Sequence, residues 1–319
     1  MSLIEKPNVL SLLILGIVVI IAAAFGVVTY TQRPETNHFN VDEEYAWDYD
    51  FARPDRVISL PGKLQEISGL CPAFAEGMLF AIQDEDGDLF TVDPDGGEVV
   101  DQLKFDKNRD YEGVTRNDSL VFILERDGDI FQFKYQEGVR EYNSDKLETD
   151  FSYGNETEGI CYDDRTGNLL IVPKERELNP AENDNRHGIY AYDFERENII
   201  PQPVFYIDEF EVGHAIYGKS SRFNFKPSGV AVDPVTGDIY VIAAVGNLLV
   251  VITRESEIKH IELLDEKTFR QPEGITFNAA GDLFISSEGK GKDAVIATFK
   301  RQTLRREMTG DPQPADNNE

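Results

Sequence analysis

Tyr111-Glu112-Gly113-Val114 is one of five related stretches that decide the fold of this chain. In the other four, Glu or Ser again precedes a glycine and an aliphatic residue follows it: Ile67-Ser68-Gly69-Leu70, Thr157-Glu158-Gly159-Ile160, Pro227-Ser228-Gly229-Val230 and Pro272-Glu273-Gly274-Ile275. Successive glycines lie 44, 46, 70 and 45 residues apart. Each stretch opens a unit of short apolar strands divided by turns. A period of about 45 residues with several strands per unit predicts a β-propeller, in which each repeat is one blade.

The number of blades follows from the last repeat, which is one strand short. Its strands are expected at 275–277, 282–286 and 294–300. The strand candidate 56–60, which precedes the first repeat, can supply the missing outer strand and so join the two ends of the ring. We therefore expect an all-β, five-bladed propeller at 45–302, with six blades as the alternative.

The third repeat is longer than the others by some 25 residues. The extra length falls in two insertions, at 175–187 and 209–226. In a propeller, the turn after the second strand and the link into the next blade open on one face, so both insertions should lie on the face of the Glu-Gly motifs. Loops that decorate one face of a rigid scaffold commonly carry function.

The amino-terminal region is different in kind, because residues 9–28 form an apolar run without charge. Twenty helical residues rise about 30 Å, which matches the hydrocarbon core of a bilayer. The run continues past the small residues 22–24, whereas the apolar part of a signal peptide usually ends there after about 7–15 residues. The sequence thus favours an uncleaved transmembrane helix within 1–30 over a cleaved signal peptide.

The remaining boundaries follow from composition. Residues 31–44 are polar and are expected to be a linker, and residues 303–319 have the composition of a disordered tail. A slight excess of positive charge before the apolar run predicts a single-pass protein of a bacterial inner or plasma membrane. The propeller is then expected on the periplasmic or extracellular side.

The net charge limits the classes of binding partner, and the positions of the two cysteines indicate whether they form a disulfide. A formal net charge of -28 disfavours nucleic acid and favours cations or basic partners. Cys71 and Cys161 occupy the same place in the first and third repeats, on blades that are not adjacent. That separation is too large for a disulfide, so both are expected to be buried free thiols.

The residue before each motif glycine is expected at the mouth of the central channel. These residues form the ring Ser68, Glu112, Glu158, Ser228 and Glu273. Three carboxylates converging there cannot all stay ionised, so either one takes a proton or a cation lies among them. A hard cation with oxygen ligands indicates calcium. The alternative is that each Glu accepts hydrogen bonds from backbone amides and ties blade to blade.

Other residues on this face are weaker candidates. Asp110 and Glu156, each two residues before a motif Glu, are expected as additional metal ligands. The candidates for the ligand-binding face are Ser68, Ser228, Asp84, Glu125, Lys174, Glu175, Lys219 and Arg222. His187 and His214 fall in the two insertions and could meet there, although lone surface histidines are more common.

Residues 213–220 match the phosphate-loop pattern GxxxxGK[ST]. That motif works between a strand and a following helix whose amino terminus holds the phosphates. The residues after Ser220 have no helical period, so an ATPase is not expected.

Several phrases resemble the SdiA-regulated (YjiK-like) family of bacterial proteins. They are 158–163 (EGICYD), 170–175 (LIVPKE), 80–85 (FAIQDE) and 272–276 (PEGIT). The resemblance covers roughly residues 55–302 and implies a five-bladed propeller distantly similar to NHL-repeat proteins, with a membrane anchor, a calcium site and no established enzymatic activity. Ser68 and Ser228 depart from the Glu pattern and would reduce the carboxylates of such a site.

Two functions remain open at this point. The first is a membrane-anchored, calcium-binding propeller that binds a protein or small-molecule ligand outside the cytoplasm. The second is a phytase-like or lactonase-like hydrolase that uses calcium on the same face. We lean against an enzyme because no nucleophile-and-base motif is visible. Basic residues converging beside the acidic ring would favour the hydrolase.

Overall fold

The computed structural model describes residues 14, 17–18, 34, 36–180 and 185–302. By its contacts the chain divides into Met1–Asn37 and His38–Glu319, and the fold below belongs to the second unit. The expected transmembrane segment, apart from Ile14, Ile17 and Val18, and the expected tail at 303–319 lie outside the described residues. None of the helices in the described residues has the length and apolar character needed to cross a membrane.

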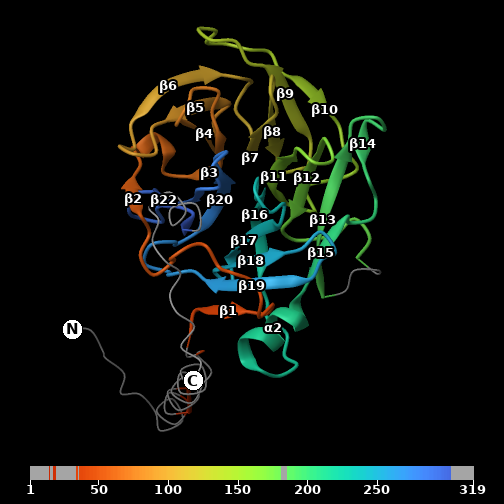
Figure 1. Ribbon diagram of the computed structural model, residues 1–319. Helices are drawn as coiled ribbons and strands as arrows, with labels where there is room; N and C mark the ends of the chain where they lie inside the picture. The colour runs from red at the N-terminus through yellow and green to blue at the C-terminus, as the bar shows by residue number, and fades with distance from the viewer. Residues whose placement is uncertain (1–13, 15–16, 19–33, 35, 181–184, 303–319) are drawn as a thin grey trace, which may run out of the picture. The chain divides into compact units, whose positions relative to one another are not determined.

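Five antiparallel sheets form the ring, each of them one blade (Figure 1). The strands of blades one and two are β3 (Ile67–Pro72), β4 (Leu79–Gln83), β5 (Asp88–Val92) and β6 (Val99–Lys104), then β7 (Tyr111–Arg116), β8 (Leu120–Glu125), β9 (Ile130–Lys134) and β10 (Asp145–Leu147). Those of blade three are β11 (Thr157–Asp163), β12 (Asn168–Pro173), β13 (Arg186–Asp193), β14 (Asn198–Ile199) and β15 (Phe205–Asp208). Those of blades four and five are β16 (Lys226–Val232), β17 (Ile239–Val245), β18 (Leu248–Ile252) and β19 (Ile258–Leu263), then β20 (Pro272–Phe277), β21 (Leu283–Ser287) and β22 (Val295–Phe299).

Closure of the ring is as the sequence predicts. Strand β2 (Arg56–Ser59) precedes blade one and pairs antiparallel with β22, the last strand of blade five. The inner strands β3, β7, β11, β16 and β20 each lie beside the inner strands of both neighbouring blades. The prediction of five blades is therefore confirmed, and six blades are excluded. A short 3₁₀ helix, η1 (Gly62–Leu64), leads from β2 into blade one.

Part of the stretch expected to be a linker is ordered. Strand β1 (His38–Asn40) pairs with β19 and adds a fifth strand to the outside of blade four. The chain then passes over blades four and five with aromatic side chains inward, and Trp47 stacks on the buried ring of His260 at 3.9 Å between ring centroids. No periodicity predicts this contact, because it depends on one short strand and separate aromatic residues.

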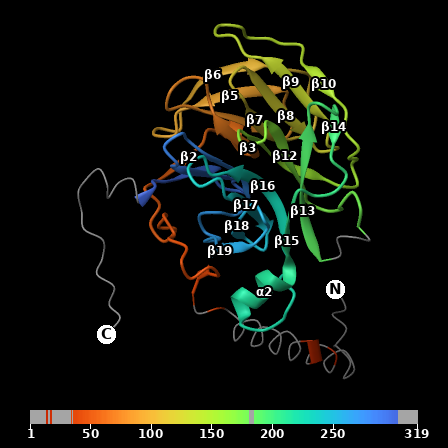
Figure 2. The same ribbon diagram turned by 45° about the vertical axis from the view of Figure 1, so that its right-hand side comes forward.

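The second insertion contains a helix that the sequence analysis did not expect. Helix α2 (Glu209–Tyr217) is visible beside β15 in Figure 2. The Asp208 side chain caps it by accepting from the Phe210 and Glu211 amides, at 2.8 and 3.3 Å. Gly218 ends it in the left-handed conformation, with φ 65°. The helix overlaps the start of the phosphate-loop pattern at 213–220, and the described chain after Ser220 leads into β16 without a further helix.

The motif glycines allow the inner strands to approach closely. A Cβ atom on Gly69 would lie 2.9 Å from the Gly113 Cα atom, and one on Gly159 would lie 2.8 Å from the Gly229 Cα atom. Pairing of every inner strand with its neighbour shifts register at the motif. The Glu or Ser before the glycine is thus a bulge residue, which turns its side chain out of the regular pattern.

The spaces between blades are filled by apolar side chains of neighbouring sheets. Cys71 and Cys161 are buried in this core as free thiols, as predicted. Burial raises the pKa of the Cys71 thiol to about 12 and also raises that of Cys161, so neither is a reactive thiolate at neutral pH.

Candidate functional site

The motif residues converge at one end of the channel. Ser68, Glu112, Glu158 and Glu273 line a single small cavity of about 10 Å³ together with the motif glycines. This is room for about one water molecule. Four of the five expected ring residues therefore line the same cavity. The fifth, Ser228, does not line it, but the Gly229 that follows it does.

The two serines bind backbone. The Ser68 hydroxyl donates to the Tyr111 carbonyl at 2.8 Å, and the Ser228 hydroxyl donates to the Pro272 carbonyl at 2.6 Å. Each bond connects one inner strand to the next blade. At these two positions the serine ties blade to blade, whereas the alternative considered from the sequence concerned each Glu as an acceptor from backbone amides.

The three glutamates are arranged differently, because they face one another and one lysine. The Lys174 ammonium donates to Glu158 Oε1 at 2.7 Å, and Glu158 also shares a hydrogen bond with Glu273. Burial, followed by the charge of Glu158, raises the pKa of Glu112 to about 9. Burial, followed by Glu158, raises the pKa of Glu273 well above its usual value. At neutral pH Glu112 therefore carries a proton, the pKa of Glu273 is raised in the same direction, and Glu158 is paired with Lys174.

Two more carboxyl groups extend this cluster toward solvent. Burial and the nearby Glu66 raise the pKa of Asp84 to about 6, and burial and Asp84 raise that of Glu288 to about 7. Asp84 Oδ1 is buried and has no hydrogen-bond partner among the described residues. We call Asp84, Glu112, Glu158, Glu273, Glu288 and Lys174 the acidic mouth.

The expected additional ligands have other partners. Asp110 and Glu156 both bind Arg126, whose guanidinium lies 3.2 Å from Asp110 Oδ2 and 2.7 Å from Glu156 Oε1. A cation at these two carboxylates would first have to displace the arginine.

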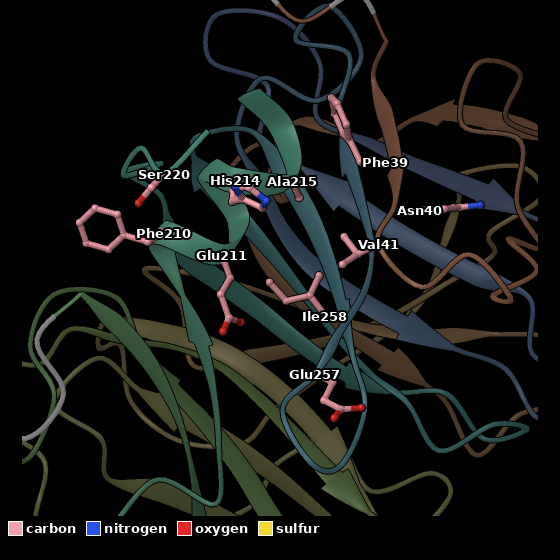
Figure 3. A pocket seen from close by; sticks show the side chains of 10 residues that line it. All are labelled: Phe39, Asn40, Val41, Phe210, Glu211, His214, Ala215, Ser220, Glu257 and Ile258. Carbon is pink, nitrogen blue, oxygen red and sulfur yellow. The ribbon is translucent and has the colours of Figure 1, made fainter. Parts of the chain in front are cut away.

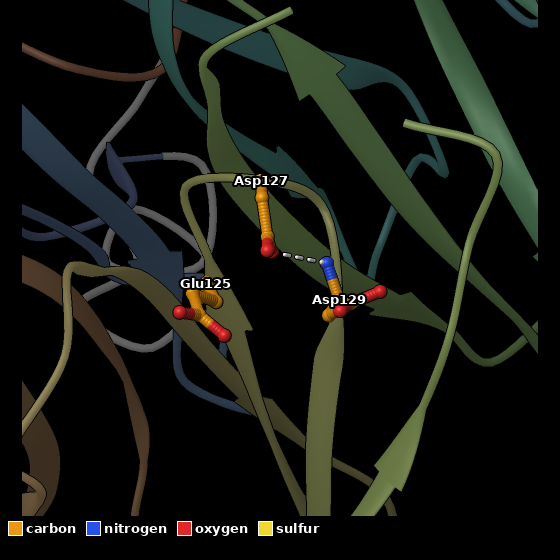
Figure 4. Close-up of side chains that lie close together, drawn as sticks. All are labelled: Glu125, Asp127 and Asp129. Atoms are coloured by element: carbon orange, nitrogen blue, oxygen red, sulfur yellow. Dashed lines mark hydrogen bonds between the residues drawn. The ribbon is translucent and has the colours of Figure 1, made fainter. Parts of the chain in front are cut away.

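Glu125 belongs to a separate acidic group on blade two. It lies with Asp127 and Asp129 at the turn between β8 and β9 (Figure 4). Within the described residues this is the only set of three carboxylates whose oxygens all lie within 4.8 Å of one another. However, Glu125 is 3.3 Å from Arg109, and Asp129 forms an ion pair with Lys146. Two of its three carboxylates thus already have a basic partner in the protein.

The insertion residues pair mainly among themselves. Glu175 forms an ion pair with Lys226, and Arg222 forms one with the buried Glu209. His187 Nε2 lies 3.3 Å from Glu209 Oε1. Lys219 is exposed beyond the end of α2.

His214 lies in a different setting from His187. It lines a hollow of about 690 Å³ between β1 and α2, with Phe39, Val41 and Phe210 (Figure 3). We call this hollow the α2 groove. Sequence reasoning missed it because neither β1 nor α2 was expected.

The acidic mouth offers carboxyl groups that can bind a cation or hold protons, and one lysine. Its lysine is hydrogen-bonded to a carboxylate, and that contact helps to raise the lysine pKa although burial opposes it. Such a lysine is neither a nucleophile nor a base at neutral pH. The carboxyl groups, by contrast, are oxygen ligands of the kind that hard cations prefer.

Solved structures of similar fold are distant in sequence. Glutaminyl cyclase from Myxococcus xanthus is 12% identical, with a TM-score of 0.50 over 78% of this chain and 95% of that one. A luciferin-regenerating enzyme is 12% identical, with a TM-score of 0.49 over 78% and 95% of the two chains. PQQ-bound aldose sugar dehydrogenase from Streptomyces coelicolor is 13% identical, with a TM-score of 0.47 over 77% and 97%. At such identities the likeness concerns the fold alone.

The comparison with curated proteins finds no match. The sequence profile of one family, SdiA-regulated, matches residues 45–290, which is most of the propeller. The resemblance noted in the repeated phrases is thereby confirmed, and the chain belongs to the SdiA-regulated family.

Proposed function

We propose that this protein is a binding module, anchored to a membrane by residues 9–28, whose acidic mouth holds a calcium ion and presents a ligand-binding face outside the cytoplasm. The membrane part of the proposal rests on the length and apolar character of that run. The calcium part rests on one observation, the mutual burial of three glutamates with a single lysine.

The arrangement fits a cation because it is short of positive charge. Three glutamates and one lysine leave two negative charges if all are ionised, and burial makes that state costly. The described residues offer no hydrogen-bond donor to the Glu112 carboxylate, unlike Glu158, which has Lys174. Glu112, Glu158 and Glu273 would hold the ion, which would supply the positive charge that protons supply in its absence.

Lys174 is the competitor of a cation at this place. Its ammonium occupies the position where positive charge is needed, and it holds Glu158 by a direct hydrogen bond. Binding of calcium would therefore release protons from Glu112 and Glu273 and loosen Lys174 from Glu158. Calcium affinity should accordingly rise with pH.

The hydrolase alternative has less support from the site. It called for basic residues that converge beside the acidic ring. Lys174 and Arg126 do lie there, but each is hydrogen-bonded to carboxylates of the protein. Arg222 likewise pairs with Glu209.

Calorimetric titration of the purified chain with calcium tests the proposal. Repeating it in two buffers of different ionisation enthalpy counts the protons released. We expect one bound ion, proton release near pH 7, and loss of binding in Glu112→Gln. The matched control is Glu125→Gln, at the separate acidic group, which should bind normally. Absence of binding to the unaltered chain at both pH 7 and pH 9 would overturn the calcium proposal, and the same samples can be assayed for phosphatase and lactonase turnover.

A further inference from the structure

A second cavity opens at the other end of the channel. The residue after each motif glycine is aliphatic and lines the small cavity of the acidic mouth: Leu70, Val114, Ile160, Val230 and Ile275. The residue two positions after each glycine has a short side chain and lines a different cavity. These residues are Cys71, Thr115, Cys161, Ala231 and Thr276. The glycines and aliphatic residues thus separate two hollows, and short side chains leave the second one open.

This second cavity, which we call the lower cavity, has the size of a small-molecule site. Its volume is about 700 Å³, within the range of about 300–1,000 Å³ that is usual for ligand pockets. Much of its wall is formed by large apolar or aromatic side chains: Phe74, Met78, Tyr162, Phe277 and Phe284. Polar groups form nearly half of the exposed lining, so the cavity fits a molecule that combines a flat apolar body with a polar group.

One arginine gives the lower cavity its polarity. Arg116 is half-buried and lies over the Phe74 ring, at 4.4 Å from its centre. Its Nε atom donates to the Pro72 carbonyl at 2.7 Å, and its two Nη atoms donate to the carbonyls of Asn117 and Ala73 at 3.1 and 3.3 Å. Three of the five guanidinium hydrogens are thereby used and the head group is fixed, which leaves two for another acceptor.

Arg116 lines the lower cavity without a direct ion pair among the described residues. Ten other arginines form ion pairs with carboxylates, but within 36–180 and 185–302 no carboxylate oxygen lies within 4.0 Å of the Arg116 guanidinium. Arg165, Arg176 and Arg270 also lack an ion pair among the described residues, but only Arg116 of these four lines the lower cavity. A fixed, planar, unpaired guanidinium is suited to an anionic group.

Acidic residues at the rim of the lower cavity only weakly oppose the attraction of Arg116 for an anionic group. Glu76, Asp118 and Asp164 also line the lower cavity, but all three are exposed to solvent. Charges in water are screened within about 8–10 Å at physiological salt, whereas a direct contact to Arg116 is screened much less. The rim would therefore reduce the affinity for an anion without removing the preference set by Arg116.

We propose that the lower cavity binds a small molecule with a flat apolar body and one anionic group, which Arg116 receives. The site is separate from the acidic mouth, and the proposal does not depend on calcium. A cationic ligand attracted by the rim is the opposing possibility, and the test below distinguishes the two.

The α2 groove provides a matched control. It is of nearly the same volume and is also partly apolar, but its charged lining residues are Glu211 and Glu257, and no arginine lines it. Filling it by Ala215→Trp should leave binding in the lower cavity unchanged.

The experiment compares probes that share one body and differ in charge. Naphthalene sulfonate, its uncharged sulfonamide and naphthylmethylammonium are titrated by equilibrium dialysis into the full chain, with protein-free buffer as blank. We expect one site for the sulfonate in the unaltered chain and in Ala215→Trp. Arg116→Met should weaken sulfonate binding about tenfold or more, as expected for a charged hydrogen bond, and change sulfonamide binding less than about twofold.

Three results would overturn the proposal. They are equal sulfonate binding by Arg116→Met and the unaltered chain, loss of sulfonate binding in Ala215→Trp, and tighter binding of the ammonium probe than of the sulfonate. Retained sulfonamide binding in Arg116→Met shows that the cavity is still folded. Because every titration is carried out with a calcium chelator present, failure here and failure of the calcium proposal are distinguishable.

Discussion

The two ends of the propeller bury carboxylates in opposite ways. At the acidic mouth, Glu112, Glu158 and Glu273 face one another with one lysine among them. At the other ends of the inner strands, Asp163 and Asp233 are fully buried, and each is held by an arginine of the next blade. The first arrangement raises the pKa of its carboxyl groups, whereas the second lowers that of Asp163.

At this end of the propeller, buried carboxylates join neighbouring blades. We call the pairs Asp163–Arg254 and Asp233–Arg301 the clasps. Arg254 binds both oxygens of Asp163, at 2.6 and 3.0 Å, across blades three and four. Burial alone would raise the pKa of Asp163, but the hydrogen bonds from Arg254 and Thr166 more than offset it and leave the pKa below its usual value. Arg301 also joins blades four and five, but it binds one oxygen of Asp233 and lies 3.3 Å from Asp48 through its Nε atom.

The difference teaches where to look for function. The negative charge of a buried carboxylate that is paired with an arginine is already compensated within the protein. Carboxyl groups that face one another depend on a proton or a cation from outside, so their state responds to pH and to ions. The predictions below test this contrast.

The largest effect is expected from breaking a clasp. Arg301→Met leaves the buried charge of Asp233 without its partner and should lower the free energy of unfolding by about 3–5 kcal/mol. Denaturant unfolding measures it. The control is Arg53→Met, an exposed pair with Asp50 whose loss should change stability by less than about 1 kcal/mol. Similar losses in both variants would contradict the role given to the clasp.

At the acidic mouth, removing the lysine should lower the free energy of unfolding less than Arg301→Met does, and it should strengthen the stabilisation by calcium. Lys174→Met should lower the free energy of unfolding by about 1–3 kcal/mol in chelator, because Glu158 can take a proton in place of the ammonium. Calcium should then raise the melting temperature of this variant more than that of the unaltered chain, since the competing cation is gone. A calcium-dependent shift that is no larger in the variant would show that Lys174 and calcium do not share the site.

Stability should also depend on pH through Glu112. Its pKa is about 9 in the folded protein, compared with 4.5 for an unperturbed glutamate, as in the unfolded chain. The stabilising effect of the bound proton is complete below pH 4.5 and is lost as the pH rises through about 9. Between these values the free energy of unfolding should fall by about 1.4 kcal/mol per pH unit relative to Glu112→Gln. Parallel stability curves for the two proteins from pH 6 to pH 9, measured in chelator, would contradict the raised pKa.

The smallest effect is expected at a serine of the ring. Ser68→Ala removes the hydroxyl that donates to the Tyr111 carbonyl, so unfolding should become easier by about 0.5–1.5 kcal/mol. Calcium binding should not change, because this hydroxyl serves the contact between blades. A clear loss of calcium affinity in Ser68→Ala would assign the serine to the metal site instead.

The ring and its acidic mouth could be predicted from sequence because they repeat. Five copies of one motif fix the blade count, and the bulge before each glycine fixes where Glu112, Glu158 and Glu273 point. The candidate Lys174 also lies at the mouth, since the turn after a second strand opens on that face.

The remaining features depend on single residues that no period reveals. Strand β1 and helix α2 occur once each, and only the cap Asp208 and the stop Gly218 signal the helix. The clasps join residues 91 and 68 positions apart, Asp163 with Arg254 and Asp233 with Arg301. A partial signal for them is the phrase Asp-x-x-Thr-Gly, which occurs at 163–167 and 233–237.

The pairing of β2 with β22 has a consequence for synthesis of the chain. Strand β2 is made among the first residues of the propeller, but its partner ends at residue 299. Until β22 is made, β2 has no partner strand, although the first four blades can already fold. A nascent chain that stalls before β22 exposes the unpaired edge of β2 to other chains, so aggregation is the expected fate of carboxy-terminal truncations.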